Sequence, residues 1–586
     1  MNTISAVKLV ALFCGVCSSL AAQSNVIVDF TTTNSTPLNL GFAGFTTELL
    51  GAGIEYDDTN LQAMASKLSP GWLLYPAGTS GDAFDWASGL TSNDWITVIA
   101  GKVGPNNTAA TLCSNTVNAL IGKGGAQFTN FASLAASIGG AKIIVCVNGF
   151  TDSPASAGAF AGFALSNHIS VAAWELCNEP YLFQGATGFF TNGYDYCAKM
   201  LPYRNAIKAA DSNAVVAVFF SDPGRPGVSW DNALATYGAT NQYWDAVVYH
   251  YYPQLPTNST FAQLMAMDNG ILFSNSTSYV RNTLIAKTAR TNTTFLLTEF
   301  NPVAGNGLGG QFPPTSTLYG GIYGAEMLLR LSTLPRVTFA GSYQLVNGSG
   351  VDTTNSFWNA VTKAAANNYV TNTVGLPFGY FLSAQGSAEV IAYWALNRST
   401  AVYPTTVATN CPLVPMDTNG LAFMPAIYAQ AYEGGNGKRY VVLANKGSNA
   451  VPIQITVDGA IVTNQLLETF VTGSDPSVVN VNPPTANNVA IQTRAAANPL
   501  TVPQYSVVRV EWAATNIPAP TLALTLSNKA ENLRWAGLSN VVYNVQAATN
   551  LPGTWTTLGR VANQDTNFSF TIWNGRSPQF YRLTVP

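Results

Sequence analysis

Charged side chains are scarce in this sequence: only 9% of the 586 residues are Asp, Glu, Lys or Arg, and the net charge is −3. Nucleic-acid-binding surfaces need clustered positive charge, so nucleic acid is not an expected partner. Because 47% of the residues are hydrophobic, the chain can fill a large core spread over several domains. No segment has 18 uninterrupted apolar residues, so we expect no membrane-spanning helix.

Histidine and cysteine, the usual ligands of zinc, are also few. The only histidines are His168 and His250, and the chain has seven cysteines. Five cysteines remain once an expected leader peptide is removed, and no C-x-x-C pair survives among them. A zinc site is therefore not expected, and no cofactor is implied.

The N-terminus is typical of a signal peptide spanning residues 1–22. Lys8 supplies a positive charge, Leu9–Val16 a short apolar segment, and Ser19–Ala22 a cleavage site of mostly small residues. The apolar segment is too short to cross a bilayer. We expect a protein secreted to the periplasm or the extracellular space.

Apolar runs with strand character alternate with helix-compatible segments through the first two thirds of the chain. Alternating strands and helices predict a parallel sheet, and eight strands predict a closed (β/α)8 barrel, placed at residues 25–375. The eight expected strands are Leu40–Leu49, Trp72–Pro76, Ile143–Asn148, Ala172–Cys177, Val215–Phe220, Ala246–His250, Phe295–Thr298 and Val337–Leu345.

Two of these expected strands end in a glutamate. Val171–Pro180 (V-A-A-W-E-L-C-N-E-P) brings Glu179 to its end, and Thr293–Pro302 (T-T-F-L-L-T-E-F-N-P) does the same for Glu299. The carboxyl ends of barrel strands carry the chemistry in this fold. The glutamates are about 120 residues apart, which fits three βα units of about 40 residues each. Paired carboxylates at one rim suit glycosidic bond cleavage.

The motif W-E-x-x-N-E-P, ending at Glu179 and Pro180, resembles the acid/base motif of retaining glycoside hydrolases of clan A. The resemblance implies that Glu179 is the acid/base and Glu299 the nucleophile. It also implies that Asn178 binds the sugar hydroxyl next to the anomeric carbon. In the sixth strand, Tyr249 and His250 are both candidates to hold the nucleophile ionised. Glu175 is expected to point into the barrel with a structural role.

Within clan A, the resemblance narrows to glycoside hydrolase family 79, which contains β-glucuronidases and heparanases. It rests on Glu48 at the end of the first strand, which implies a substrate-binding role, and on the second-strand loop Leu74–Trp86. The chain departs from family 79 after the nucleophile, where the Gly-rich loop 304–310 contains Asn306 and Gly307 but no tyrosine. Backbone N–H groups of this loop could form an anion nest, with Tyr343 contributing from the eighth strand, or the loop could be a lid.

The last third of the chain predicts β structure. Short strands at Val390–Tyr393, Arg439–Leu443, Ile453–Val457, Val489–Ile491 and Ser506–Trp512 indicate a β-sandwich at residues 376–513, which strand Asn25–Phe30 is expected to join. A linker at 514–521 leads to a small all-β module at 522–586. Its rings, such as Trp535 and Trp555, either form a core or stack on sugars.

These features together predict a secreted retaining β-glycosidase with a glycoside or oligosaccharide as substrate. The first hypothesis is a β-glucuronidase that acts on uronic-acid-bearing glycans. The alternatives are a neutral-sugar hydrolase of clan A, such as a β-xylosidase or α-L-arabinofuranosidase, and a carbohydrate-binding protein without catalysis. The oligomeric state does not follow from the sequence.

Overall fold

The fold was obtained as a computed structural model. The structure describes residues 25–47, 55–91, 93–103, 126–183, 189–221, 228–252, 292–301, 317–346, 360–363, 380–415, 423–480, 486, 488–514, 522–527, 530–536, 543–550, 554–561, 567–573 and 580–584. The expected signal peptide, the linker residues 515–521, Glu48, Asn306 and Gly307 lie outside these ranges.

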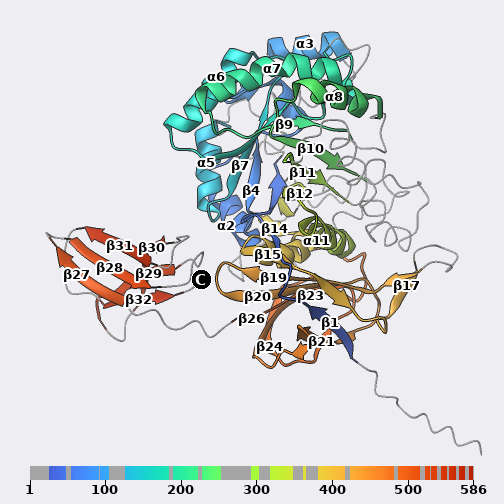
Figure 1. The fold of residues 1–586 in the computed structure, drawn as a ribbon, viewed down its shortest axis with the longest axis vertical. Helices are drawn as coiled ribbons and strands as arrows, with labels where there is room; N and C mark the ends of the chain where they lie inside the picture. Colours follow the sequence, from blue (N-terminus) through green and yellow to red (C-terminus); the bar gives the residue numbers. More distant parts are fainter. Residues whose placement is uncertain are drawn as a thin grey trace, which may run out of the picture.

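Eight parallel strands close into a barrel surrounded by helices, so the predicted fold class is confirmed (Figure 1). Most of their residues are buried, as expected of strands covered on both faces. In ring order the strands are β3 (Ala43–Thr46), β4 (Trp72–Tyr75), β7 (Lys142–Val147), β8 (Val171–Leu176), β9 (Val216–Phe219), β10 (Ala246–Tyr251), β11 (Thr294–Phe300) and β12 (Val337–Tyr343).

Polar side chains cap the N-termini of several barrel helices. Asp58, Ser153, Asn192, Thr317 and Ser383 each accept hydrogen bonds from backbone N–H groups in the first turn of the helix that follows. The described helices of the barrel are α2 (Thr59–Leu68), α3 (Asn93–Val103), α5 (Phe128–Ser137), α6 (Pro154–Ser166), α7 (Gly193–Ala210), α8 (Val228–Asn241), α11 (Leu318–Ser332) and α12 (Ala384–Leu396).

The expected strand Val390–Tyr393 is wrong, because these residues lie within α12. A run of four apolar residues does not distinguish a strand from the buried face of a helix. The Ser383 hydroxyl accepts the Gly386 N–H and starts the helix, which packs against α11. The chain therefore passes from the barrel helices to the β-rich region after Leu396.

Two sheets pack face to face below the barrel and form the β-sandwich (Figure 1). The N-terminal strand β1 (Val26–Phe30) joins the smaller sheet, between β16 (Thr405–Val407) and β21 (Val451–Val457), which also pairs with β22 (Ala460–Ile461) and β25 (Leu500–Val502). The larger sheet runs β2 (Thr36–Pro37), β15 (Ser399–Tyr403), β19 (Ile427–Gly434), β20 (Lys438–Asn445), β26 (Ser506–Ala513), β23 (Leu466–Thr472) and β24 (Gln492–Ala496).

A small all-β module follows the sandwich, as predicted. It contains two antiparallel sheets, β27 (Leu522–Ser527), β28 (Ala530–Ala536) and β31 (Asn567–Trp573) in one, and β30 (Thr556–Val561), β29 (Tyr543–Ala548) and β32 (Phe580–Thr584) in the other. Trp535, Tyr543 and Phe568 are buried between the sheets. These rings therefore form a core, whereas Trp555 is half-buried beneath the Arg582 guanidinium.

Candidate active site

The candidate site lies at the carboxyl ends of β8, β10 and β11. Glu179 follows β8 by three residues, and its backbone adopts a left-handed conformation with φ +40, as does Cys177 with φ +67. Such conformations are costly for residues with a side chain and tend to occur at functional sites. Pro180 then opens a short 3-10 helix, η2 (Pro180–Phe183), after the strand has ended at Leu176.

Glu299 is the last residue but one of β11 and is aligned with His250 of the neighbouring β10. The His250 ring nitrogen Nδ1 lies 3.1 Å from Glu179 Oε1 and 3.2 Å from Glu299 Oε2. The two oxygens are therefore at most about 6.3 Å apart, 3.1 Å plus 3.2 Å. That limit is compatible with the roughly 5–5.5 Å of retaining glycosidases and lies below the roughly 6.5–9.5 Å of inverting ones.

Two tyrosine hydroxyls hold the carboxylates, and neither was predicted from the sequence. Tyr181 in η2 donates to Glu179 Oε1 at 2.6 Å, and Tyr252, just after β10, donates to Glu299 Oε2 at 2.7 Å. Burial, followed by the charges of Glu299 and Glu179, raises the pKa of Tyr252 well above its usual value. The hydroxyl therefore keeps its proton and stays a donor.

Asn178 is fixed by the loop that follows β4. Its backbone N–H donates to Asp82 Oδ1 at 3.2 Å, and its side-chain amide donates to Thr79 Oγ1 at 3.3 Å. Both partners belong to η1 (Thr79–Ala83), the second-strand loop singled out in the sequence. The loop thus orients a residue that adjoins Glu179, and its sugar-binding role stays a prediction.

The other predicted site residues differ in how they lie relative to the two glutamates. His250 contacts both carboxylates, whereas Tyr249 is buried one residue earlier in β10. Tyr343 ends β12, and its hydroxyl is close enough to Tyr252 to contribute to raising the Tyr252 pKa. Its backbone oxygen accepts a hydrogen bond from Asn301. Tyr343 therefore borders the site.

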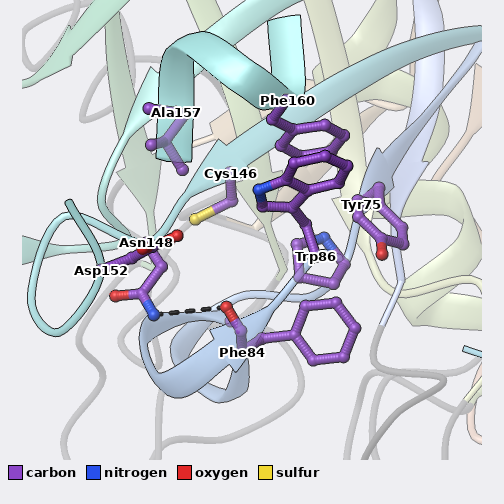
Figure 2. Close-up of a pocket in the computed structure, with 11 residues that line it drawn as sticks. Tyr75, Phe84, Trp86, Cys146, Asn148, Asp152, Ala157 and Phe160 are labelled. Atoms are coloured by element: carbon purple, nitrogen blue, oxygen red, sulfur yellow. Dashed lines mark hydrogen bonds between the residues drawn. The ribbon is translucent and has the colours of Figure 1, made fainter. Parts of the chain in front are cut away.

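A small cavity lies beside the site, between β7 and α6 (Figure 2). Its volume is about 10 Å³, which is room for one water molecule. Cys146 from β7 and Asn148 just after it line the cavity, and Trp86 stacks on Phe160 with the ring centroids 4.5 Å apart. The cavity is too small to hold a sugar.

Neither metal nor membrane features are found in the described parts of the chain. No group of His, Cys, Asp and Glu side chains there is arranged to hold a metal ion. None of the described helices is long and apolar enough to cross a membrane.

Comparisons with known proteins support the fold. No protein-family model and no curated protein matches the sequence. Among solved structures, the family 51 α-L-arabinofuranosidase from Thermotoga petrophila matches with a TM-score of 0.60 and 15% identity, covering 83% of this chain and 100% of that one. The α-L-arabinofuranosidase from Thermotoga maritima matches with a TM-score of 0.59 and 16% identity, covering 83% and 99%.

A xyloglucanase of glycoside hydrolase family 44 from Paenibacillus polymyxa also matches, with a TM-score of 0.50, 12% identity and coverage of 84% and 100%. At such low identities the likeness shows a shared fold, a barrel followed by β-rich domains. The chain is therefore similar in architecture to clan A glycoside hydrolases. The narrower resemblance to family 79 stays a prediction.

Proposed function

We propose that this chain is a retaining glycoside hydrolase that acts on a neutral sugar. The observation that carries the proposal is the meeting of Glu179 and Glu299 at one nitrogen of His250, on the rim where barrel enzymes place their chemistry. Two carboxylates this close, each held by a tyrosine hydroxyl, suit double displacement.

In the first step, Glu299 attacks the anomeric carbon while Glu179 gives its proton to the departing glycosidic oxygen. This forms a covalent glycosyl-enzyme and releases the aglycone. In the second step, Glu179 takes a proton from water, which attacks the same carbon and frees Glu299. Tyr252 holds one Glu299 oxygen, so that the carboxylate keeps a fixed orientation through both steps.

We rank a neutral sugar before a uronate as the substrate. A uronate carboxylate needs a cation or free donors around carbon 6. The buried cations in the described ranges, Lys446 and Arg509, belong to the sandwich. The Tyr181 and Tyr252 hydroxyls donate hydrogen bonds to Glu179 and Glu299. The structural neighbours named as α-L-arabinofuranosidases make pentose glycosides the first substrates to test.

Variants of the two glutamates test the mechanism. Glu179→Gln and Glu299→Gln should each lower kcat by a factor on the order of 10³ or more, because each removes a group that forms or breaks a bond. Glu55→Gln changes an exposed glutamate and is the matched control. Product analysis by NMR should show the retained anomer first. Unchanged turnover in both site variants would leave this mechanism without support, and no turnover by the wild type would make a binding protein the better account.

Azide assigns the roles of the two glutamates. An acid/base Ala variant should yield a glycosyl azide of retained configuration, whereas a nucleophile Ala variant should yield the inverted azide. We expect the retained product from Glu179→Ala and the inverted product from Glu299→Ala. The opposite pattern would exchange the two roles.

Nitrophenyl glycosides decide the sugar class. We expect turnover of 4-nitrophenyl α-L-arabinofuranoside or β-xyloside. Turnover of the β-glucuronide alone would overturn the neutral-sugar proposal and restore the family 79 prediction. Secretion through residues 1–22, which we also propose, would bring the enzyme to extracellular glycans.

A further inference from the structure

A closed ring of hydrogen bonds joins helix α12 to the end of the strand that carries Glu299. Its members are buried polar groups, which need partners within the protein because water does not reach them. The ring consists of Asn301 directly after β11, Ser342 and Tyr343 at the end of β12, and Gln385 and Glu389 one turn apart on α12.

Each contact of the ring has the geometry of a hydrogen bond. The Asn301 side-chain amide donates to the Tyr343 backbone oxygen, and the Asn301 side-chain oxygen accepts from Gln385 Nε2 at 3.3 Å. The same Gln385 nitrogen donates to Glu389 Oε1 at 3.0 Å. The Ser342 hydroxyl donates to this oxygen at 2.8 Å. Because Ser342 precedes Tyr343, the contacts return to the strand from which they started.

The ring lies where the backbone ladder between β11 and β12 has ended. That ladder stops at Leu297, two residues before Glu299, and Glu299 is aligned instead with His250 of β10. On its β12 side, the end of β11 is held by the contact from Asn301 to Tyr343. The amide that Gln385 presents to Asn301 fixes the orientation of this contact.

Helix α11 leaves room for the Glu389 carboxyl at Gly324. A Cβ atom at this position would lie 2.3 Å from Glu389 Oε1, so any side chain there would displace the carboxyl. Glycine inside a helix is less favourable than alanine. Here it allows Glu389 to reach both Ser342 and Gln385.

We propose that Gln385 is a positioning residue, which acts through Asn301 to fix the end of β11 and with it the direction of the Glu299 carboxylate. Glu389 holds Gln385 in the required orientation. The inference rests on the proposed glycosidase function, in which Glu299 attacks the anomeric carbon. Attack needs an aligned approach, so a small displacement of the carboxylate slows this step. The expected signature is a lower kcat with little change in KM.

A double-mutant cycle of Gln385 and Asn301 tests this route. Gln385→Met removes the amide at similar side-chain length and should lower kcat about tenfold with KM unchanged. Asn301→Ala should lower kcat at least as much, and adding Gln385→Met to it should lower kcat less than about twofold further.

Gln430→Met is the matched control for this cycle. Gln430 is a buried glutamine of β19 in the sandwich, and its amide donates to the Tyr403 backbone oxygen. The variant should lower the melting temperature and leave kcat unchanged, because it removes a buried hydrogen bond far from the candidate site. Thermal denaturation shows that each variant is folded at the assay temperature.

Variants around Glu389 provide a second test if Gln385→Met fails to fold. Gly324→Ala should push the carboxyl away from Gln385 and lower kcat by a similar factor. Glu389→Leu should do the same, whereas Glu389→Gln keeps an acceptor oxygen for Gln385 and Ser342 and should keep kcat near the wild-type value. Gly162→Ala on α6 is the matched control, because a Cβ there meets no atom beyond its own helix backbone closer than 3.9 Å.

The outcomes separate this inference from the function on which it rests. If the wild type turns over glycosides and both Gln385→Met and Gly324→Ala keep its kcat, the positioning role is overturned and the function stands. If the effects of Gln385→Met and Asn301→Ala multiply in full, Gln385 does not act through Asn301, and the inference is likewise overturned. A wild type that cleaves no glycoside would overturn the proposed function, and the positioning role with it.

Discussion

Two glutamates of the barrel are equally buried, yet their surroundings are opposite. Glu326 on α11 faces the sandwich and contacts Lys446 Nζ at 2.7 Å and the Arg330 guanidinium at 2.5 Å. Burial alone would raise its pKa, but Lys446 and Arg330 hold it below the ordinary value. Glu175 has no described cation beside it, and burial raises its pKa to about 8.

The surroundings of the two glutamates differ because one lies at a junction between domains and the other lies beside the candidate active site. At the junction of barrel and sandwich a permanent charge pair fixes one element on another, and nothing there has to move a proton. In the candidate site, a neighbouring lysine or arginine would hold the glutamates ionised and oppose the protonated state that the proposed acid/base needs. The site therefore uses Tyr181, Tyr252 and His250, which orient the carboxylates without a permanent positive charge.

Removing the cation at the junction should have the largest effect. Lys446→Met leaves Glu326 buried with only Arg330, and we expect the free energy of unfolding to fall by about 3–5 kcal/mol. Urea denaturation measures it. Lys199→Met is the matched control, because the Lys199–Asp195 pair is exposed and should contribute at most about 1 kcal/mol. Equal losses of unfolding free energy in the two variants would contradict the claim that the buried pair stabilises the fold more than the exposed one.

The pH dependence of stability should separate the two glutamates next. Glu175 has a raised pKa in the folded state, so its contribution is complete below about pH 4.5 and is lost as pH rises to about 8. We expect the wild type to lose up to about 5 kcal/mol over this window relative to Glu175→Gln. Glu326, whose pKa is lowered, behaves in reverse: its contribution is present above pH 4.5 and lost below.

Glu389 is the matched control for that measurement. Burial raises its pKa to about 7, and hydrogen bonds from Gln385 and Ser342 oppose the shift. The loss of stability that Glu389 causes as pH rises should therefore be smaller, up to about 3 kcal/mol, and complete at a lower pH, and Glu389→Gln should remove it. If wild type and Glu175→Gln lose stability in parallel between pH 5 and 9, Glu175 does not carry a buried proton.

Much of this architecture followed from the sequence because its signals are local. Apolar strands with helices between them predict the barrel, and Glu179 and Glu299 each stand where an apolar run ends. The strand β1 is a short alternating run set apart from the barrel, and it pairs with the sandwich. Such features need no knowledge of which segments meet in space.

The missed features arise from contacts between distant segments. Tyr252 was passed over because alternation along the sixth strand was applied to Tyr249 and His250, whereas a register shift lies between Val248 and His250. Tyr181 lies in a short helix that no periodicity reveals. The ion pair of Glu326 with Lys446 joins residues 120 positions apart, and only the docking of α11 on the sandwich brings them together.

The smallest expected effect concerns the hydroxyls that replace cations in the site. Tyr252→Phe removes the hydrogen bond to Glu299, and Tyr181→Phe removes the one to Glu179. Each should therefore lower kcat/KM roughly 10- to 30-fold, which corresponds to a loss of about 1.5–2 kcal/mol of transition-state stabilisation. Tyr440→Phe removes a tyrosine hydroxyl bonded to Asn436 in the sandwich and should leave kcat/KM unchanged.

The two site variants should also differ from each other in substrate dependence. Loss of the Glu179 partner affects protonation of the leaving oxygen, so Tyr181→Phe should matter most for substrates with basic leaving groups and least for nitrophenol. Tyr252→Phe alters the nucleophile and should slow both. If the Phe variants match the wild type on every substrate, the tyrosine hydroxyls do not orient Glu179 and Glu299. His250 would then be the group that orients them in place of the cations that hold Glu326.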